Sequence, residues 1–258
     1  MKSVVSRDGT PIAFEVVGSG PPLVIVVGAF SDHARGGPLA QSLTSQLTVY
    51  TYDRRGRGAS GDTRPYAVER EIEDLDAIIA AAGGSAFVFG YSSGAVLAIE
   101  AAAAGSRVTK LAVYDVPLKA DGPLWNIDRA AELERLVGAG RRGDAVEYFQ
   151  EQMMGMPAAV VAQLRAGPGR PSLEAMAPSL VYDARLVGDG ALPLDAVRAL
   201  AMPTLALGGL ASAPFMAATA EAIGQLAPGG ASRLLVGQSH DLDPEVLGPI
   251  LAEFLLAG

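Results

Sequence analysis

The chain has 258 residues, a formal net charge of −8 and no cysteine. This length fits one large domain, or one domain that carries an insertion. The negative charge opposes binding to nucleic-acid phosphates and to an anionic membrane surface, so we expect neither partner. Because the sequence lacks cysteine, a disulfide scaffold, a thiolate nucleophile and a cysteine-based metal site are excluded. The N-terminal sequence MKSVVSRDGT has no apolar signal core, which predicts a cytoplasmic protein.

Two uncharged stretches, residues 77–99 and 199–220, are each long enough to span a bilayer. Turn-forming residues interrupt both of them, at Gly83-Gly84 in the first and at Pro203 and Pro214 in the second. Such interruptions favour the helix, strand and turn units of a water-soluble domain over a membrane span.

The first part of the chain is typical of β-strands. Residues 11–17 partly alternate between apolar and polar side chains, and a Gly/Pro-rich turn follows. Residues 23–27 (LVIVV) form a continuous apolar run, which predicts a strand buried on both faces. Residues 47–52 predict a further short strand, and residues 39–46 between these two strands predict a helix.

The next part of the chain alternates between helices and strands. Residues 68–82 have apolar side chains at helical spacing and end at a Gly-Gly pair. Residues 86–90 predict a strand, residues 94–104 an Ala-rich helix, and residues 108–114 another strand. This alternation predicts a parallel sheet with helices on both faces.

The alternation stops after Asp115, and the sequence up to Met202 shows helical periodicity without a convincing strand. A single crossover connection needs far fewer residues, so we predict an inserted helical lid over residues 118–199. The core domain would then comprise residues 1–117 and 200–258. Its C-terminal part predicts a strand over 203–207, a helix over 215–226, a strand over 233–236 and a final helix opened by Asp243-Pro244.

The strongest chemical motif is Gly90-Tyr91-Ser92-Ser93-Gly94, a G-x-S-x-G sequence between a predicted strand and a predicted helix. In this context the sharp turn exposes the serine as a nucleophile, and the helix N-terminus supplies backbone N–H groups beside it. The alternative is a purely structural turn. We predict that Ser92 is the nucleophile.

A nucleophilic serine needs a base, and the chain has two histidines. His240 lies in a loop after the last predicted strand and completes the chain order serine, acid, histidine. We predict that it is the base rather than a solvated loop residue. His33 follows the first buried strand, where lining the entrance or capping a helix is favoured over contact with substrate.

Together these segments resemble the α/β-hydrolase superfamily over essentially the whole chain. The resemblance implies an eight-stranded, mostly parallel sheet, a helical cap after strand six and a Ser-His-acid triad. A serine at position 92 is similar to the esterase and lactonase branches, because epoxide hydrolases and haloalkane dehalogenases have aspartate there. The segments that carry the resemblance are LVIVVGAF (23–30), YDRRGRGAS (52–60), GYSSG (90–94), VYDVP (113–117), PTLALGG (203–209) and GQSHDLDP (237–244).

The chain departs from the family pattern in the loop after strand three, where Val27-Gly28 replaces the usual His-Gly. The oxyanion hole of such enzymes uses backbone N–H groups, which this change does not remove. By analogy we expect the donors to be Ser93 together with Ala29 or Gly28.

The second departure concerns the triad acid, because residues 208–214 after strand seven contain no carboxylate. Asp115, at the end of strand six, is the best substitute, in a position that some relatives use. The alternative role for Asp115 is to cap the entrance to the lid. Asp183 and Asp241 are the carboxylates to compare with it by mutation.

The sequence DRRGRG at 53–58 resembles a family loop in which an Asp-Arg pair braces a glycine turn. The alternative is an arginine patch that receives an acidic substrate. Gly18-Ser19-Gly20 precedes a strand instead of opening a helix, so it is not a dinucleotide fingerprint. No spacing of His, Asp and Glu indicates a metal site, and we expect no cofactor.

We expect a small-molecule substrate, and we make no prediction of oligomeric state. Aromatic and Met side chains in the predicted lid favour an uncharged, apolar substrate. The favoured function is a cofactor-free serine hydrolase that cleaves a carboxylic ester or lactone. The alternatives are a non-hydrolytic ligand-binding protein, a perhydrolase and a C–C hydrolase. Candidate substrate contacts are Phe30, Tyr91, Trp125, Met153 and Met154.

Overall fold

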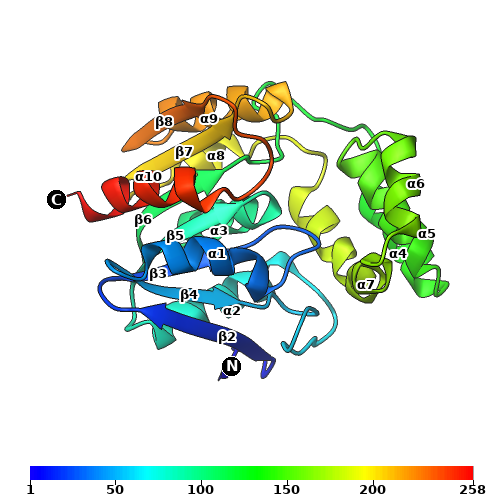
Figure 1. The fold of residues 1–258 in the computed structure, drawn as a ribbon, viewed down its shortest axis with the longest axis horizontal. Helices are drawn as coiled ribbons and strands as arrows, with labels where there is room; N and C mark the ends of the chain where they lie inside the picture. The colour runs from blue at the N-terminus through cyan, green and yellow to red at the C-terminus, as the bar shows by residue number, and fades with distance from the viewer. Residues whose placement is uncertain (258) are drawn as a thin grey trace.

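The predicted strands form one sheet in the computed structural model, which describes residues 1–257 (Figure 1). Its eight strands lie in the order β1-β2-β4-β3-β5-β6-β7-β8, with β1 and β2 antiparallel to their neighbours and all other pairs parallel. The predicted eight-stranded, mostly parallel sheet is therefore confirmed. The strands are β1 (Lys2–Val5), β2 (Pro11–Gly18), β3 (Pro22–Val26), β4 (Thr48–Tyr52), β5 (Ala86–Tyr91), β6 (Val108–Tyr114), β7 (Thr204–Gly209) and β8 (Gly230–Leu235).

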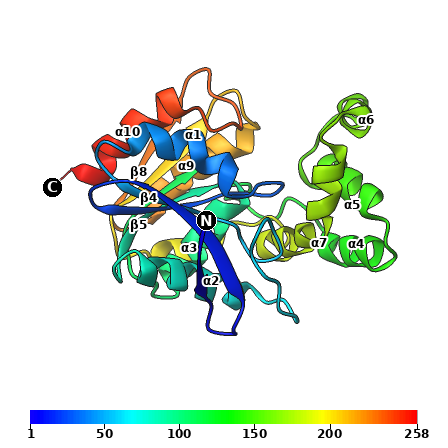
Figure 2. The ribbon, with the colours of Figure 1, turned by 60° about the horizontal axis from the view of Figure 1, so that its bottom comes forward.

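Helices cover both faces of the sheet, as the alternating pattern predicts (Figures 1 and 2). On β3, Leu23 and Ile25 pack against the cluster that includes α1 and α10, whereas Val24 and Val26 pack on the opposite cluster. This alternation explains the continuous apolar run, because both faces of the strand are buried. The helices are α1 (His33–Leu43) and α10 (Pro244–Leu256) on one face, and α2 (Val68–Ala81), α3 (Ser93–Ala103), α8 (Leu194–Arg198) and α9 (Pro214–Leu226) on the other.

Two elements differ from the sequence predictions. The helix predicted over 39–46 begins earlier, at His33, because the Asp32 side chain caps it by accepting a hydrogen bond from the Ala34 amide at 3.0 Å. Strand β1 had no prediction, since it is a short, largely exposed edge strand without an apolar face. No helix within residues 1–257 has the length and hydropathy to cross a membrane, and residues 77–99 are divided among α2, β5 and α3.

Between β6 and β7 the chain forms a lobe of helices beside the sheet, which we call the helical insertion (Figure 2). It has its own apolar core, which includes Leu133, Val146, Phe149 and Leu180. That this insertion acts as a lid stays a prediction. Its elements are α4 (Arg129–Gly138), α5 (Arg142–Tyr148), a π-helical turn (Phe149–Met153), α6 (Ala158–Ala166) and α7 (Arg170–Val187).

Candidate active site

Ser92 lies at the sharp turn between β5 and α3, with φ 55° and ψ −129°. Glycines on both sides make this turn possible. A Cβ at Gly90 would lie 2.5 Å from the Ala95 Cα, and one at Gly94 would collide with the carbonyl oxygen of Val26. The serine is therefore presented in a strained conformation at the N-terminus of α3, as the G-x-S-x-G motif predicts.

Three side chains from distant parts of the sequence meet at this turn. His240 Nε2 lies 3.0 Å from Ser92 Oγ, and His240 Nδ1 lies 3.1 Å from Asp115 Oδ2. Asp115 is fully buried at the end of β6, and His240 is in the loop after β8. The structure thus brings together the residues predicted as nucleophile, base and acid, and their catalytic roles stay predictions.

The loop after β7, which lacks a carboxylate, donates hydrogen bonds to Asp115 instead. The Gly209 amide donates to Asp115 Oδ1 at 2.8 Å, and the Ser212 hydroxyl donates to Oδ2. Asp115, which directly follows β6, is thus held in place by the end of β7 and the loop after it. Asp183 and Asp241 have arginine partners and, within residues 1–257, make no hydrogen bond to His240.

Two tyrosines hold the loop that carries the histidine. The Tyr91 hydroxyl donates to the His240 carbonyl oxygen at 2.8 Å, and the Tyr114 hydroxyl donates to the Ser239 carbonyl oxygen at 2.5 Å. Burial raises the pKa of Tyr91 to about 12, although Arg35 opposes the rise, so this hydroxyl remains a donor at neutral pH. Tyr91, a predicted substrate contact, is only 6% exposed and supports the histidine loop instead.

The loop after β3 approaches the serine closely at Gly28. A Cβ at this glycine would lie 2.7 Å from the Ser92 Cβ, so only glycine fits there. Within residues 1–257 the amides of Gly28, Ala29 and Ser93 donate to no other residue. These amides therefore suit an oxyanion hole, and the absence of a side chain at Gly28 allows the loop to approach Ser92 closely.

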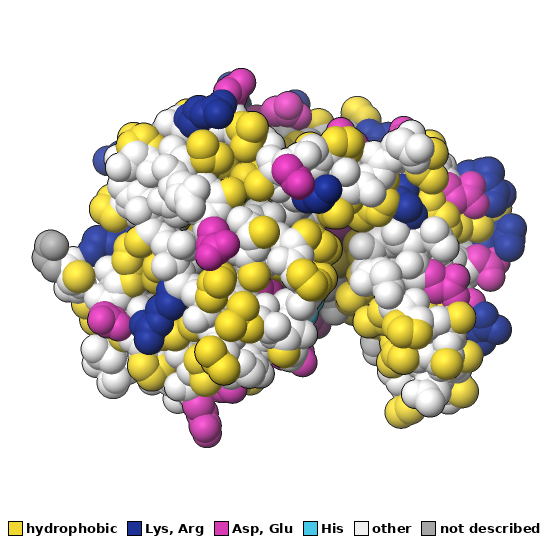
Figure 3. All heavy atoms as spheres, turned by 90° about the horizontal axis from the view of Figure 1, so that it is seen from above, with side chains coloured by type: hydrophobic (Ala, Val, Ile, Leu, Met, Phe, Trp, Pro, Cys, Tyr) yellow, Lys and Arg dark blue, Asp and Glu magenta, His cyan; other side chains and the backbone are white. Residues whose placement is uncertain are grey.

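The other candidate substrate contacts are spread over different surroundings. Phe30 and Met153 belong to the apolar cluster of the helical insertion, and Phe30 packs edge-on against Phe149 with ring centroids 5.4 Å apart. Trp125 packs on the main sheet cluster, and Met154 is 43% exposed. In Figure 3 the molecule is hollowed between its main body and the helical insertion.

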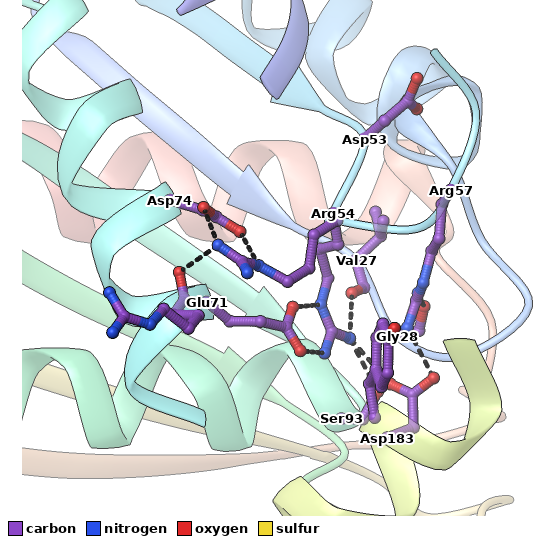
Figure 4. Close-up of polar contacts among 12 residues, drawn as sticks. Val27, Gly28, Asp53, Arg54, Arg57, Glu71, Asp74, Ser93 and Asp183 are labelled. Atoms are coloured by element: carbon purple, nitrogen blue, oxygen red, sulfur yellow. Dashed lines mark hydrogen bonds and ion pairs between the residues drawn. The ribbon is translucent and has the colours of Figure 1, made fainter. Parts of the chain in front are cut away.

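The arginines of the DRRGRG loop are all buried, and Figure 4 shows the polar contacts of Arg54 and Arg57. Arg54 pairs with Glu71 and Asp183, and Arg57 also pairs with Asp183. Since their guanidinium groups are buried and paired with carboxylates, the alternative of an arginine patch that receives an acidic substrate is wrong. The predicted Asp-Arg brace is not found within residues 1–257, because Asp53 pairs with none of the three arginines. Asp53 instead accepts a hydrogen bond from the Ala59 amide at 2.8 Å across the glycine turn. The third arginine of the loop, Arg55, pairs with Asp74 and Asp8.

Asp32, His33 and Asp53 place three potential metal ligands within 4.8 Å of one another. Each of these side chains already has a structural partner. Asp32 caps α1, and Asp53 Oδ1 is bonded at 2.8 Å to both the amide and the Nδ1 of His33. Burial lowers the pKa of His33, but the hydrogen bond and charge of Asp53 more than offset this and raise it above its usual value. The arrangement is explained by the start of α1.

Sequence reasoning considered Asp183 only as an alternative acid and missed its contacts. It lies in the buried run Leu180–Ala184 of α7, where a charged side chain interrupts apolar neighbours. A charged residue within an apolar helical run indicates a buried ion pair, and the three arginines of the DRRGRG loop need carboxylate partners. These two features together could have predicted the pairing.

The sheet order and the sharp strand-to-helix turn at Ser92 define an α/β protein of the kind in which a G-x-S-x-G sequence joins a strand to a helix. A model of the alpha/beta hydrolase family matches residues 23–249, and the chain belongs to this family. The chain is 47% identical to an alpha/beta hydrolase from Sphaerobacter thermophilus DSM 20745, whose crystal structure superposes with a TM-score of 0.90 over 98% of this chain and 100% of the other.

Two further comparisons extend this result. The chain is 36% identical over 96 residues to the uncharacterized hydrolase YraK of Bacillus subtilis (strain 168), a match over 36% of this chain and 35% of YraK. The match thus spans about a third of the length of this curated relative. Esterase RhEst1 from Rhodococcus sp. ECU1013 has a TM-score of 0.73 at 21% identity, with 98% of each chain covered, and shares the fold.

Proposed function

We propose that this protein is a cofactor-free serine hydrolase that cleaves a carboxylic ester or lactone of an apolar small molecule through an acyl-enzyme. The observation that carries the proposal is the continuous set of contacts from Ser92 Oγ through His240 to the buried Asp115. This arrangement of nucleophile, base and acid activates a serine hydroxyl in unrelated folds.

The reaction begins when His240 Nε2 accepts the proton of Ser92 Oγ as that oxygen attacks the ester carbonyl carbon. Asp115 holds the proton on Nδ1 and stabilises the imidazolium. The amides of Ser93 and Ala29 receive the negative charge that develops on the carbonyl oxygen. As the C–O bond to the alcohol breaks, His240 gives its proton to the leaving oxygen. Water then repeats the sequence on the acyl-enzyme and releases the acid and free serine.

The surroundings of the serine support an uncharged, apolar substrate. Phe30, Phe149 and Met153 share one apolar cluster with Ala29 of the oxyanion loop. The nearby guanidinium groups of Arg54 and Arg57 are buried and neutralised by carboxylates. They are therefore not free to bind a substrate carboxylate or phosphate.

The test combines covalent labelling with turnover. We expect a fluorophosphonate probe to label the protein stoichiometrically at Ser92, located by peptide mass spectrometry. We expect Ser92→Ala to abolish both labelling and hydrolysis of p-nitrophenyl butyrate without changing the melting temperature, whereas Ser45→Ala, at an exposed serine, keeps both. Unchanged turnover in Ser92→Ala would refute the proposal, and an unreactive wild-type protein would favour a ligand-binding function.

A panel of simple esters and macrolactones then identifies the substrate class. Each product is analysed directly, because perhydrolysis and C–C cleavage would use the same three residues and differ only in what they release. Free acid and alcohol as the sole products support the proposal, and a peracid or a cleaved C–C bond contradicts it.

A further inference from the structure

One buried carboxylate from the helical insertion contacts one side of the candidate oxyanion hole directly and the other side through Arg57 (Figure 4). Asp183, on α7, is fully buried. Its Oδ1 accepts a hydrogen bond from the Ser93 hydroxyl at 2.7 Å, and its Oδ2 accepts one from Arg57 Nη2 at 2.5 Å. Ser93 is the residue that supplies one of the two proposed oxyanion donors.

Arg57 carries the contact onward to the loop that supplies the other donor. Its Nη1 donates to the Gly28 carbonyl oxygen at 2.6 Å and to the Ser31 carbonyl oxygen at 3.3 Å. These carbonyl groups stand on either side of Ala29. The direction of the Ala29 amide therefore depends on where the guanidinium lies, and Asp183 is the carboxylate that holds this guanidinium.

The opposite charges of Asp183 and Arg57 make the contact between them strong. Burial raises the pKa of Asp183, but the positive charges of Arg57 and Arg54 outweigh burial and lower it below its usual value, so the carboxylate is ionised. Charge-assisted hydrogen bonds in a water-poor interior are stronger and shorter than neutral ones. Arg54 has a second, two-pronged partner in Glu71, whereas Arg57 has no other carboxylate within residues 1–257.

We propose that Asp183 is a positioning residue that keeps the Ser93 and Ala29 amides aimed at one point, so that hydrolysis depends on the docking of α7 against the sheet. The proposal rests on the proposed function, because it assigns these amides to the oxyanion. The helical insertion is then a structural part of the catalytic centre in addition to any role in substrate access.

The same loop offers a matched control for the loss of a buried ion pair. Arg55 pairs with Asp74 through two hydrogen bonds of 2.7 Å, and both side chains are as buried as Arg57 and Asp183. Asp74 makes no contact with residues 27–31 or with Ser93 among the hydrogen bonds of the described chain. Breaking either pair should destabilise the fold, but only one of them should change the oxyanion hole.

The experiment compares Asp183→Asn with Asp74→Asn on p-nitrophenyl butyrate. We expect kcat to fall about 10²-fold in Asp183→Asn, as when one oxyanion donor is lost, while KM changes little. We expect Asp74→Asn to melt at a lower temperature and to keep its kcat. Inhibition by a trifluoromethyl ketone, which forms an oxyanion on the serine, should weaken in Asp183→Asn in proportion to the loss in kcat/KM.

A milder variant covers the case in which Asp183→Asn does not fold. Ser93→Ala removes only the hydroxyl that bonds Asp183 and keeps the Ser93 amide and both ion pairs. We expect a several-fold fall in kcat with a matching loss of ketone affinity. A folded Asp183→Asn with wild-type kcat, or a Ser93→Ala with wild-type kcat and ketone affinity, overturns the inference. In either case an active wild-type protein with a labelled Ser92 leaves the proposed function standing.

Discussion

The role of Asp115 as triad acid is tested by Asp115→Asn. The expected effect follows from the different partners of the two carboxylate oxygens. Oδ1 accepts from the Gly209 amide, and Oδ2 faces both His240 Nδ1 and the Ser212 hydroxyl. In the variant the amide oxygen stays on Gly209, which places the NH₂ group against Nδ1. Because two donors cannot bond each other, the imidazole moves its proton to Nε2, and Nε2 can no longer accept the proton of Ser92.

This wrong tautomer sets the magnitude of the effect. We expect kcat to fall about 10⁴-fold, as in triads that lose the acid by the same change, which corresponds to about 5 kcal/mol of transition-state stabilisation. The assay is steady-state hydrolysis of p-nitrophenyl butyrate, with circular dichroism to show that the fold is kept. The control is Asp241→Asn, an exposed residue paired with Arg35, which we expect to stay within about twofold of wild type. Full activity in Asp115→Asn would show that the acid is misassigned.

Two further predictions concern Gly28 and Asp8. A Cβ at Gly28 would lie 3.2 Å from Ser92 Oγ, so Gly28→Ala should displace the nucleophile and lower the burst rate of p-nitrophenol release by about 10²-fold; a wild-type burst would contradict this. Burial raises the pKa of Asp8, but hydrogen bonds from Thr10 and Arg55 lower it to about 2. Its stabilisation is complete above the unfolded pKa of about 4 and is lost as pH falls through about 2. The urea unfolding midpoints of Asp8→Asn and wild type should therefore converge as the pH is lowered. A difference between the two midpoints that does not change with pH would refute the pairing of Asp8 with Arg55.

Local sequence signals were enough to predict the central sheet and the elbow. The run at residues 23–27 is apolar throughout because both of its faces are covered, and that signal needs no knowledge of its partners. The turn at Ser92 is specified by its own neighbours Gly90 and Gly94. The prediction of Asp115 needed the family resemblance as well, because the usual position for the acid, after strand seven, has no carboxylate and the end of strand six is the position that some relatives use.

Contacts between distant segments could not be predicted in this way. The partner of Arg57 is Asp183, 126 residues further along, and no spacing in the sequence connects them. The hydrogen bond from the Tyr91 hydroxyl to the His240 carbonyl oxygen depends on the path of the loop after β8, which the sequence does not specify. The start of α1 could not be predicted for a different reason. Gly36, Gly37 and Pro38 weaken its helical pattern, and the side-chain cap at Asp32 decides where the helix begins.

Backbone strain is concentrated at the candidate site. Within residues 1–257, the residues other than glycine with positive φ are Phe30, Ser92 and Asp115, at 54°, 55° and 49°. Each belongs to a different part of the candidate site: the loop after β3 that we propose for the oxyanion, the proposed nucleophile and the proposed acid. Such conformations cost on the order of 1–3 kcal/mol each and persist only where surrounding contacts enforce them.

The contacts that enforce this strain come from different elements. Ser92 and Asp115 are held by the sheet and by the loop after β7, which form within the core. Phe30 contacts the helical insertion through the ring of Phe149. Arg57, a residue of the core that pairs with Asp183 of the insertion, bonds the carbonyl oxygens of Gly28 and Ser31 on either side of Phe30. The oxyanion loop is therefore the part of the site whose geometry depends on packing between the insertion and the core. Weakening that packing should impair stabilisation of the oxyanion before it disturbs the contact between serine and histidine, which is the order of effects that the Asp183 variants measure.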